Sequence, residues 1–91
     1  MTTEMALVQG EGLAVPERVI VAPSVGVFRP LFGHDVACGQ NVDAGQAVGV
    51  IEGPGVATPV RSPFRGVLAG LLAHDGERLR QGEPVAWLRV A

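Results

Sequence analysis

Two halves of this chain repeat each other, and the repeat constrains the fold more than any other feature of the sequence. The segment Ala22–Phe28 (APSVGVF) matches Ser62–Leu68 (SPFRGVL), 40 positions further on. The segment Val42–Val48 (VDAGQAV) matches Leu79–Val85 (LRQGEPV) at an offset of 37 positions. Because the matches occur in the same order, each half is predicted to contain the same succession of strands and turns. The sequence therefore predicts one domain with a quasi-twofold internal repeat.

A pair of polar residues is repeated as well. His34–Asp35 recurs as His74–Asp75 at the offset of 40 positions. Such pairs are candidates for metal ligands or for an acid–base pair. The repeat places them at equivalent turns, where Asp favours local hydrogen bonds to the backbone, and a twofold axis would hold the two pairs apart. We therefore favour a structural role for both pairs, and we expect no metal site and no catalytic residue.

Short apolar segments alternate with turns rich in Pro and Gly along the whole chain. No segment shows helical periodicity over three turns, so we predict an all-β barrel or sandwich. The predicted strands are Arg18–Val21, Val27–Phe28, at most one short strand in Val36–Val42, the two arms of a central hairpin, Gly66–Leu72, Arg78–Arg80 and Pro84–Val90. The predicted core is Val27, Val48, Val50, Val67, Leu68, Val85 and Leu88, with Trp87 at least partly buried.

The central hairpin is predicted from its turn. The apolar run Ala47–Ile51 leads into Gly53-Pro54-Gly55. Proline at the second position of a four-residue turn presets φ, and glycine at the third accepts the positive φ of a type II turn. The sequence therefore predicts a β-hairpin with an exposed tip near Pro54 and Gly55.

Composition limits the function classes. The formal net charge is −2, and four aromatic residues are scattered along the chain, so we expect no nucleic-acid binding. Residues 1–15 contain Gly10 and Gly12 and are too short to span a membrane, so we expect a flexible tail or an added edge strand. Residues 16–91 are then the folded domain. Cys38 is the only cysteine, which excludes an internal disulfide and favours a reducing, cytoplasmic location, with Cys38 as a small, partly buried apolar residue.

Several glycine-containing runs together resemble the biotinyl domain of biotin carboxyl carrier proteins, over Arg18–Val90. The matching runs are Val36–Glu52, Ser62–Val67, Asp75–Gly76 and Gly82–Val85. In that family the first run leads directly into the hairpin that carries the cofactor. The resemblance implies a barrel-sandwich hybrid, a flattened β-barrel of eight short strands with quasi-twofold symmetry.

The sequence departs from the family at the hairpin tip. In biotin carriers the tip is Glu-Ala-Met-Lys-Met, and lipoyl carriers also have a lysine in this turn. Here Glu52 is followed by Gly53, Pro54, Gly55 and Val56, so Gly55 stands at the lysine position, and the chain contains no lysine. Attachment of either cofactor needs an amine that forms an amide, and the guanidinium of arginine stays protonated. We therefore expect neither biotin nor lipoate on this chain.

Three functions remain open. The one that we favour is a non-catalytic binding or scaffold module, resembling the carrier subunit of acyl-CoA carboxylases. It would dock on a protein partner such as a carboxylase or acyltransferase subunit, through Pro54, Gly55, Val56, Ala57 and Pro59. The first alternative is a small-molecule-binding or catalytic protein that reuses the fold in a biosynthetic pathway, with the tip or the loop Pro30–Asp35 lining its site. The second is a carrier that is modified at an unexpected position. No membrane partner is expected, and homo-oligomerisation is left open.

Overall fold

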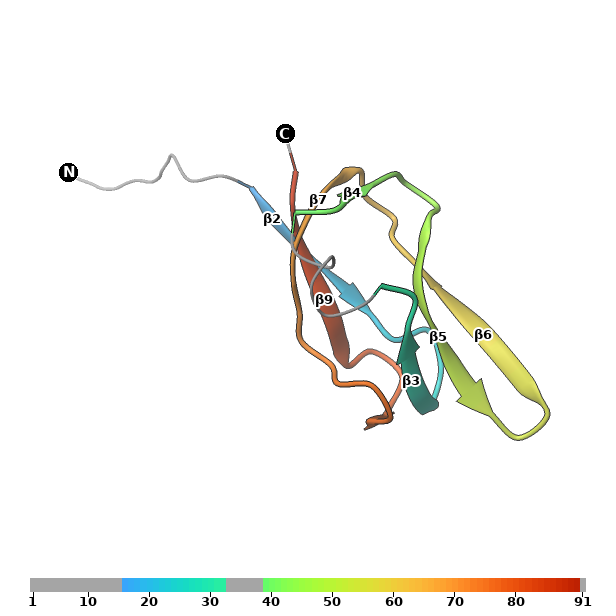
Figure 1. Ribbon diagram of the computed structural model, residues 1–91. Coiled ribbons are helices and arrows are strands. Elements are labelled where there is room, and N and C mark those ends of the chain that lie inside the picture. The colour runs from blue at the N-terminus through green and yellow to red at the C-terminus, as the bar shows by residue number, and fades with distance from the viewer. Residues whose placement is uncertain (1–15, 33–38, 91) are drawn as a thin grey trace.

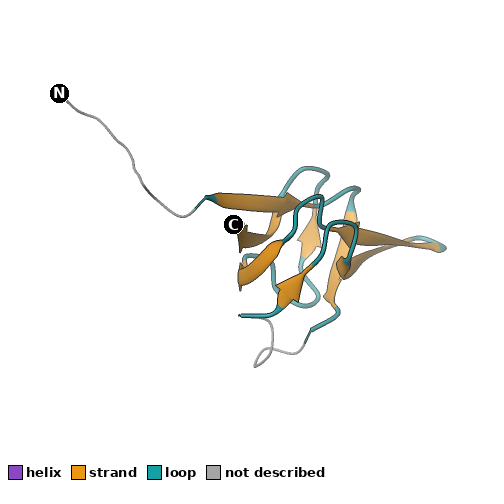
Figure 2. Ribbon diagram, turned by 90° about the horizontal axis from the view of Figure 1, so that it is seen from above, coloured by secondary structure: helices purple, strands orange, loops and turns teal. Residues whose placement is uncertain are grey.

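The structure, a computed structural model, describes residues 16–32 and 39–90, and these residues contain strands and no helix (Figures 1 and 2). The all-β prediction is therefore confirmed. No helix long and apolar enough to cross a membrane occurs in these ranges. The strands are β2 (Glu17–Val21), β3 (Gly26–Pro30), β4 (Asn41–Val42), β5 (Ala47–Gly53), β6 (Val56–Arg61), β7 (Gly66–Leu71), β8 (Arg78–Leu79) and β9 (Pro84–Arg89).

The strands form two four-stranded antiparallel sheets that pack face to face. The strand order is β2-β9-β7-β4 in sheet 1 and β6-β5-β3-β8 in sheet 2. Exchanging β2 with β6, β9 with β5, β7 with β3 and β4 with β8 converts one order into the other. This is the arrangement that the barrel-sandwich hybrid requires, and it places the β5–β6 hairpin at one edge of sheet 2.

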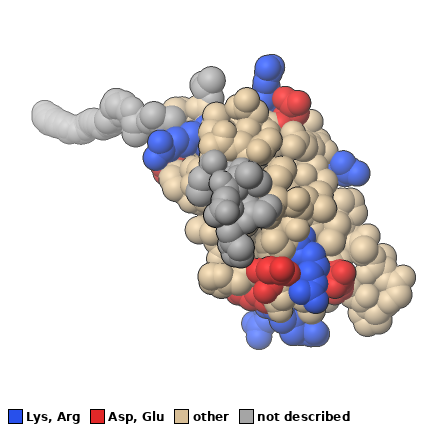
Figure 3. Space-filling model, in the orientation of Figure 1, with Lys and Arg blue, Asp and Glu red and all other residues tan. Residues whose placement is uncertain are grey.

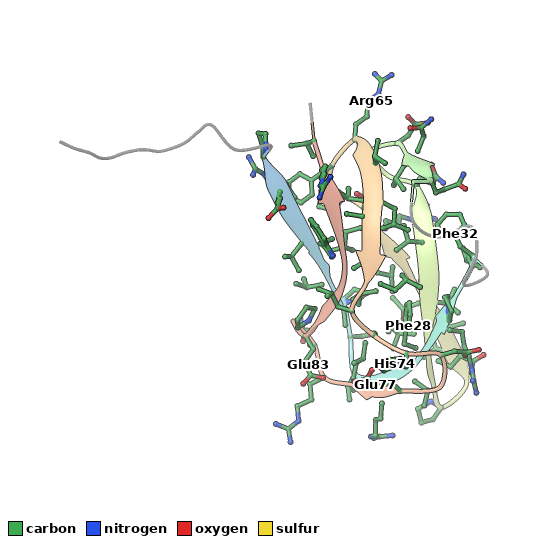
Figure 4. All side chains as sticks on the ribbon, turned by 60° about the vertical axis from the view of Figure 1, so that its left-hand side comes forward. Phe28, Phe32, Arg65, His74, Glu77 and Glu83 are labelled. Carbon is green, nitrogen blue, oxygen red and sulfur yellow. The ribbon has the colours of Figure 1, made fainter. Side chains whose placement is uncertain are left out.

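Equivalent loops make equivalent hydrogen bonds in the two halves. The backbone N–H of Phe28 donates to the carbonyl oxygen of Glu77 at 2.8 Å. At the matching positions, the N–H of Leu68 donates to the carbonyl oxygen of Gln40, also at 2.8 Å. Phe28 and Leu68 are both fully buried, and Figure 4 shows Phe28 inside the body of the domain. The two halves therefore contribute matching residues to one shared core.

The core lies between the sheets and follows the alternation of each strand. It comprises Ile20, Ala22, Phe28, Val42, Val48, Ile51, Val60, Leu68, Ala73, Leu79, Val85, Ala86 and Leu88. Of the predicted core residues, Val48, Leu68, Val85 and Leu88 are confirmed, and Trp87 is partly buried as expected.

The prediction was wrong by one strand position at three sites. Val67 is 40% exposed, because its neighbour Leu68 faces the core and adjacent side chains in a strand point to opposite faces. Val27 and Val50 are only half-buried for the same reason, with Phe28 and Ile51 taking the inward positions. Several apolar residues follow one another in these strands and do not alternate with polar residues. The sequence therefore does not show which of them point into the core.

Some predicted features lie outside the described residues. These are Cys38, the pair His34–Asp35 and the tail of residues 1–15, together with part of the loop Pro30–Asp35. The expectations about them stay predictions.

Candidate functional site at the central hairpin

The β5–β6 hairpin is closed by a two-residue turn. The register runs from Ala47 opposite Arg61 to Gly53 opposite Val56, which leaves only Pro54 and Gly55 to connect the strands. The φ of Gly55 is 70°, close to the value of about 80° at the third residue of a type II turn. The turn is thus the one that the proline and glycine pattern predicts.

The hairpin end extends beyond the rest of the domain. It is the outermost part of the molecule on its side in Figures 1 and 2, and Figure 3 shows no charged side chain on the visible face of its end. The five predicted contact residues, Pro54, Gly55, Val56, Ala57 and Pro59, are all exposed. The structure therefore brings all five together on one projecting element.

The strand register divides these residues between two faces of the hairpin. Val56 lies opposite Gly53 and shares the face of the buried Ile51, yet its side chain is 60% exposed because the hairpin has passed the edge of the core. Ala57 and Pro59 lie on the opposite, outer face. A partner that binds the end of the hairpin can therefore contact apolar groups on both faces.

The position of Gly55 is open to solvent. A Cβ atom built there has no neighbouring heavy atom within 4 Å. A side chain at this position would therefore project freely from the tip. Position 55 therefore has room for a side chain. It differs from the lysine position of biotin carriers because glycine has no amine.

An ion-pair network connects the central hairpin to β3 and to the turn between β7 and β8. Arg29 on β3 contacts Glu52 on β5, with 3.1 Å between Nε and Oε1. The same guanidinium contacts Asp75 in the β7–β8 turn, with 3.0 Å between Nη1 and Oδ1. The hydrogen bonds that Arg29 donates to Asp75 and Glu52 raise the pKa of Arg29 above its ordinary value. This network is not predicted from the sequence, because 23 and 46 positions separate the paired residues and no local pattern marks them.

The other polar side chains that the structure describes near these turns make contacts within the domain. Asp75 is paired with Arg29, and the backbone N–H of His74 donates to Oε1 of Glu77 at 2.9 Å within the same turn (Figure 4). Within residues 16–32 and 39–90, no three His, Cys, Asp or Glu side chains come together as a candidate metal site. Arg61 donates from Nη1 to the carbonyl oxygen of Gly45 at 2.9 Å.

A comparison with known protein families identifies the family of this chain. The biotin/lipoyl family, described as "biotin-requiring enzyme", matches residues 18–88. The chain therefore belongs to the biotin/lipoyl family. A search of curated proteins found no match.

Solved structures of large enzymes contain the same fold. A single-chain, multi-domain long-chain acyl-CoA carboxylase is similar with a TM-score of 0.72 and 18% identity, over 87% of this chain and 8% of that chain. The urea carboxylase of Kluyveromyces lactis gives 0.70 and 22%, over 96% of this chain and 7% of that chain. An aspartoacylase family protein of Mesorhizobium loti gives 0.60 and 18%, over 80% and 23%. This chain thus spans under a tenth of each carboxylase.

Proposed function

We propose that this protein is an unmodified, carrier-like binding module that docks on a protein partner through the end of its central hairpin. The observation that carries the proposal is Gly55, which holds the position of the attachment lysine at an exposed tip, in a chain without lysine. The residues of the tip do not fit the attachment of biotin or lipoate, since no side-chain amine is present to form the amide.

The physical form of the tip supports docking. Proline restricts the φ of residue 54, and a two-residue turn leaves little freedom to the chain, so little backbone entropy would be lost on binding. The contact residues Pro54, Val56, Ala57 and Pro59 offer apolar surface at a projecting end. Burial of one such side chain in a partner's pocket contributes about 1–2 kcal/mol.

The partner that we propose is a carboxylase or acyltransferase subunit. The similar long-chain acyl-CoA carboxylase carries this fold as a small part of a multi-domain chain. A separate module of the same fold can dock where such a domain would lie, even though it carries no cofactor. Family membership supports this choice, because members present the hairpin to other protein surfaces.

The test is affinity capture from the native organism with the tagged full chain. Wild type is compared with Pro54→Ser/Val56→Ser, after thermal melting has shown that the variant is folded. The matched control is Pro63→Ser/Pro84→Ser, which removes two exposed prolines away from the hairpin end. We expect the tip variant to lose its partner and the control to keep it. If the folded tip variant keeps all partners, the contact surface lies elsewhere, and the loop Pro30–Asp35 is the next candidate.

A further inference from the structure

A group of exposed apolar side chains lies on the outer face of sheet 1. On sheet 1, the exposed fractions of Val19, Val21 and Leu72 are each 48%, and Val67 is 40% exposed. Trp87 lies among them, paired with Val19 across β2 and β9. Single exposed apolar residues are ordinary, but a contiguous group around a tryptophan is typical of a contact surface.

The internal repeat provides a control for this face within the same molecule. Trp87 and Val21 correspond to Val50 and Arg61 on the outer face of sheet 2. That face carries the Arg29 ion pairs instead of an aromatic cluster. Because these two positions hold a smaller apolar residue and an arginine in sheet 2, the fold does not require Trp87 and Val21 there in sheet 1.

Trp87 forms one side of a hollow in this face. The hollow measures about 450 Å³ and is lined by Glu17, Val19, Leu72 and Trp87. The indole lies directly over Gly70, where a Cβ atom would be only 2.9 Å from its Nε1 atom. The guanidinium of Arg89 lies 5.5 Å from the ring centroid of Trp87. The ring is thus held in place at the side of the hollow.

We propose that the chain's own N-terminal segment, residues 1–15, covers this hollow with its apolar run Met5–Val8. The segment joins the domain beside the hollow, because Pro16 precedes Glu17 and its carbonyl oxygen accepts a hydrogen bond from the N–H of Val90 at 3.0 Å. Seven residues separate Val8 from Pro16, and they include Gly10 and Gly12.

Reach favours this occupant. Seven residues extend up to about 25 Å, whereas the hollow spans neighbouring strands only about 5 Å apart. Since the segment is tethered beside its site, its effective concentration exceeds that of a second molecule in dilute solution.

The test uses Trp87, the only tryptophan, as a fluorescent probe in the full-length chain. Leu7→Asp/Val8→Asp places charges on the apolar run, and Thr2→Asp/Thr3→Asp places the same charges elsewhere on the segment. We expect acrylamide to quench wild type and the Thr variant equally weakly. The Leu7/Val8 variant should lose this protection, and its emission should shift to longer wavelength.

Two results would overturn the proposal. Equal quenching of all three proteins would show that the run does not cover Trp87. Protection that disappears on dilution, together with a dimer in sedimentation equilibrium, would assign the face to a second copy of the chain. The readout is independent of partner capture, so its failure leaves the proposed function of the hairpin unaffected.

Discussion

Ala22 and Ser62 occupy the same position in the two halves of the fold and are held by the same backbone hydrogen bond. The carbonyl oxygen of Ala22 accepts from the N–H of Gly82 at 2.8 Å, and that of Ser62 accepts from the N–H of Gly45 at 2.6 Å. Both residues are buried. Within matching backbone structure, Ser62 therefore carries a hydroxyl group that Ala22 lacks.

This difference predicts unequal effects of two reciprocal substitutions. The Ser62 hydroxyl donates to the carbonyl oxygen of Phe64 at 2.6 Å and accepts from the Phe64 N–H at 3.1 Å. Ser62→Ala should lower the free energy of unfolding by about 1–2 kcal/mol, because these bonds are lost in a buried site. Ala22→Ser should cost less, since it breaks no existing bond. Urea unfolding of both variants checks this, and equal losses would contradict it.

Two glycines allow strands to approach closely. A Cβ atom at Gly66 would lie 2.5 Å from the carbonyl oxygen of Arg89, and one at Gly26 would lie 2.5 Å from that of Glu52. Backbone atoms of a sheet cannot move aside freely, so we expect Gly66→Ala to cost about 1–3 kcal/mol or more. The control Gly82→Ala meets no atom within 4 Å and bears only the strain of its φ of 87°, about 1–2 kcal/mol.

Chemical denaturation measures both glycine variants. Gly66→Ala should lose more stability than Gly82→Ala. A smaller loss for Gly66→Ala would show that β7 and β9 can separate without disturbing the rest of sheet 1.

Much of the fold could be predicted from the sequence because its turns are encoded locally. Pro54 and Gly55 specify a two-residue turn by their own backbone preferences, and the repeat then supplies the second half. The face of each strand was harder to predict. In Val27–Phe28 and Val67–Leu68 two apolar residues stand side by side, so hydrophobicity alone does not say which points inward.

The candidate site was only partly predictable for a different reason. The exposed tip follows from the hairpin itself. The brace from Arg29 to Glu52 and Asp75 depends on which strands become neighbours, and the cluster around Trp87 depends on the pairing of β2, β9 and β7. Contacts between residues far apart in the chain leave no local signal.

The Arg29 brace predicts a stability effect that depends on salt. Arg29→Gln should lower the melting temperature slightly in low salt, and the difference from wild type should shrink as salt screens the exposed ion pairs. A group whose pKa is raised by folding stabilises below its unfolded pKa and loses this effect as the pH rises past the folded value.

For Arg29 both pKa values lie above the working range, so its contribution should not change between about pH 6 and pH 9. Melting curves at two salt concentrations across this range check both expectations. A difference between variant and wild type that is unaffected by salt would contradict the electrostatic role.

The absence of an acceptor amine predicts an unmodified chain. Co-expressed with biotin and lipoyl ligases, the protein should keep the mass of its sequence, apart from loss of Met1. The matched positive control restores the carrier motif by Gly53→Ala, Pro54→Met, Gly55→Lys and Val56→Met, and it should gain one biotin because position 55 is open to solvent. A mass increment from either cofactor on the wild-type chain would disprove the interpretation of Gly55.

The most direct test of the docking function is a titration of the captured partner against the full-length chain and its Pro54→Ser/Val56→Ser variant. Two apolar side chains at about 1–2 kcal/mol each contribute about 2–4 kcal/mol to binding. The dissociation constant of the folded variant should therefore rise about 30-fold to 700-fold, at 1.4 kcal/mol for each factor of ten. An unchanged dissociation constant would show that the hairpin end is only a structural turn.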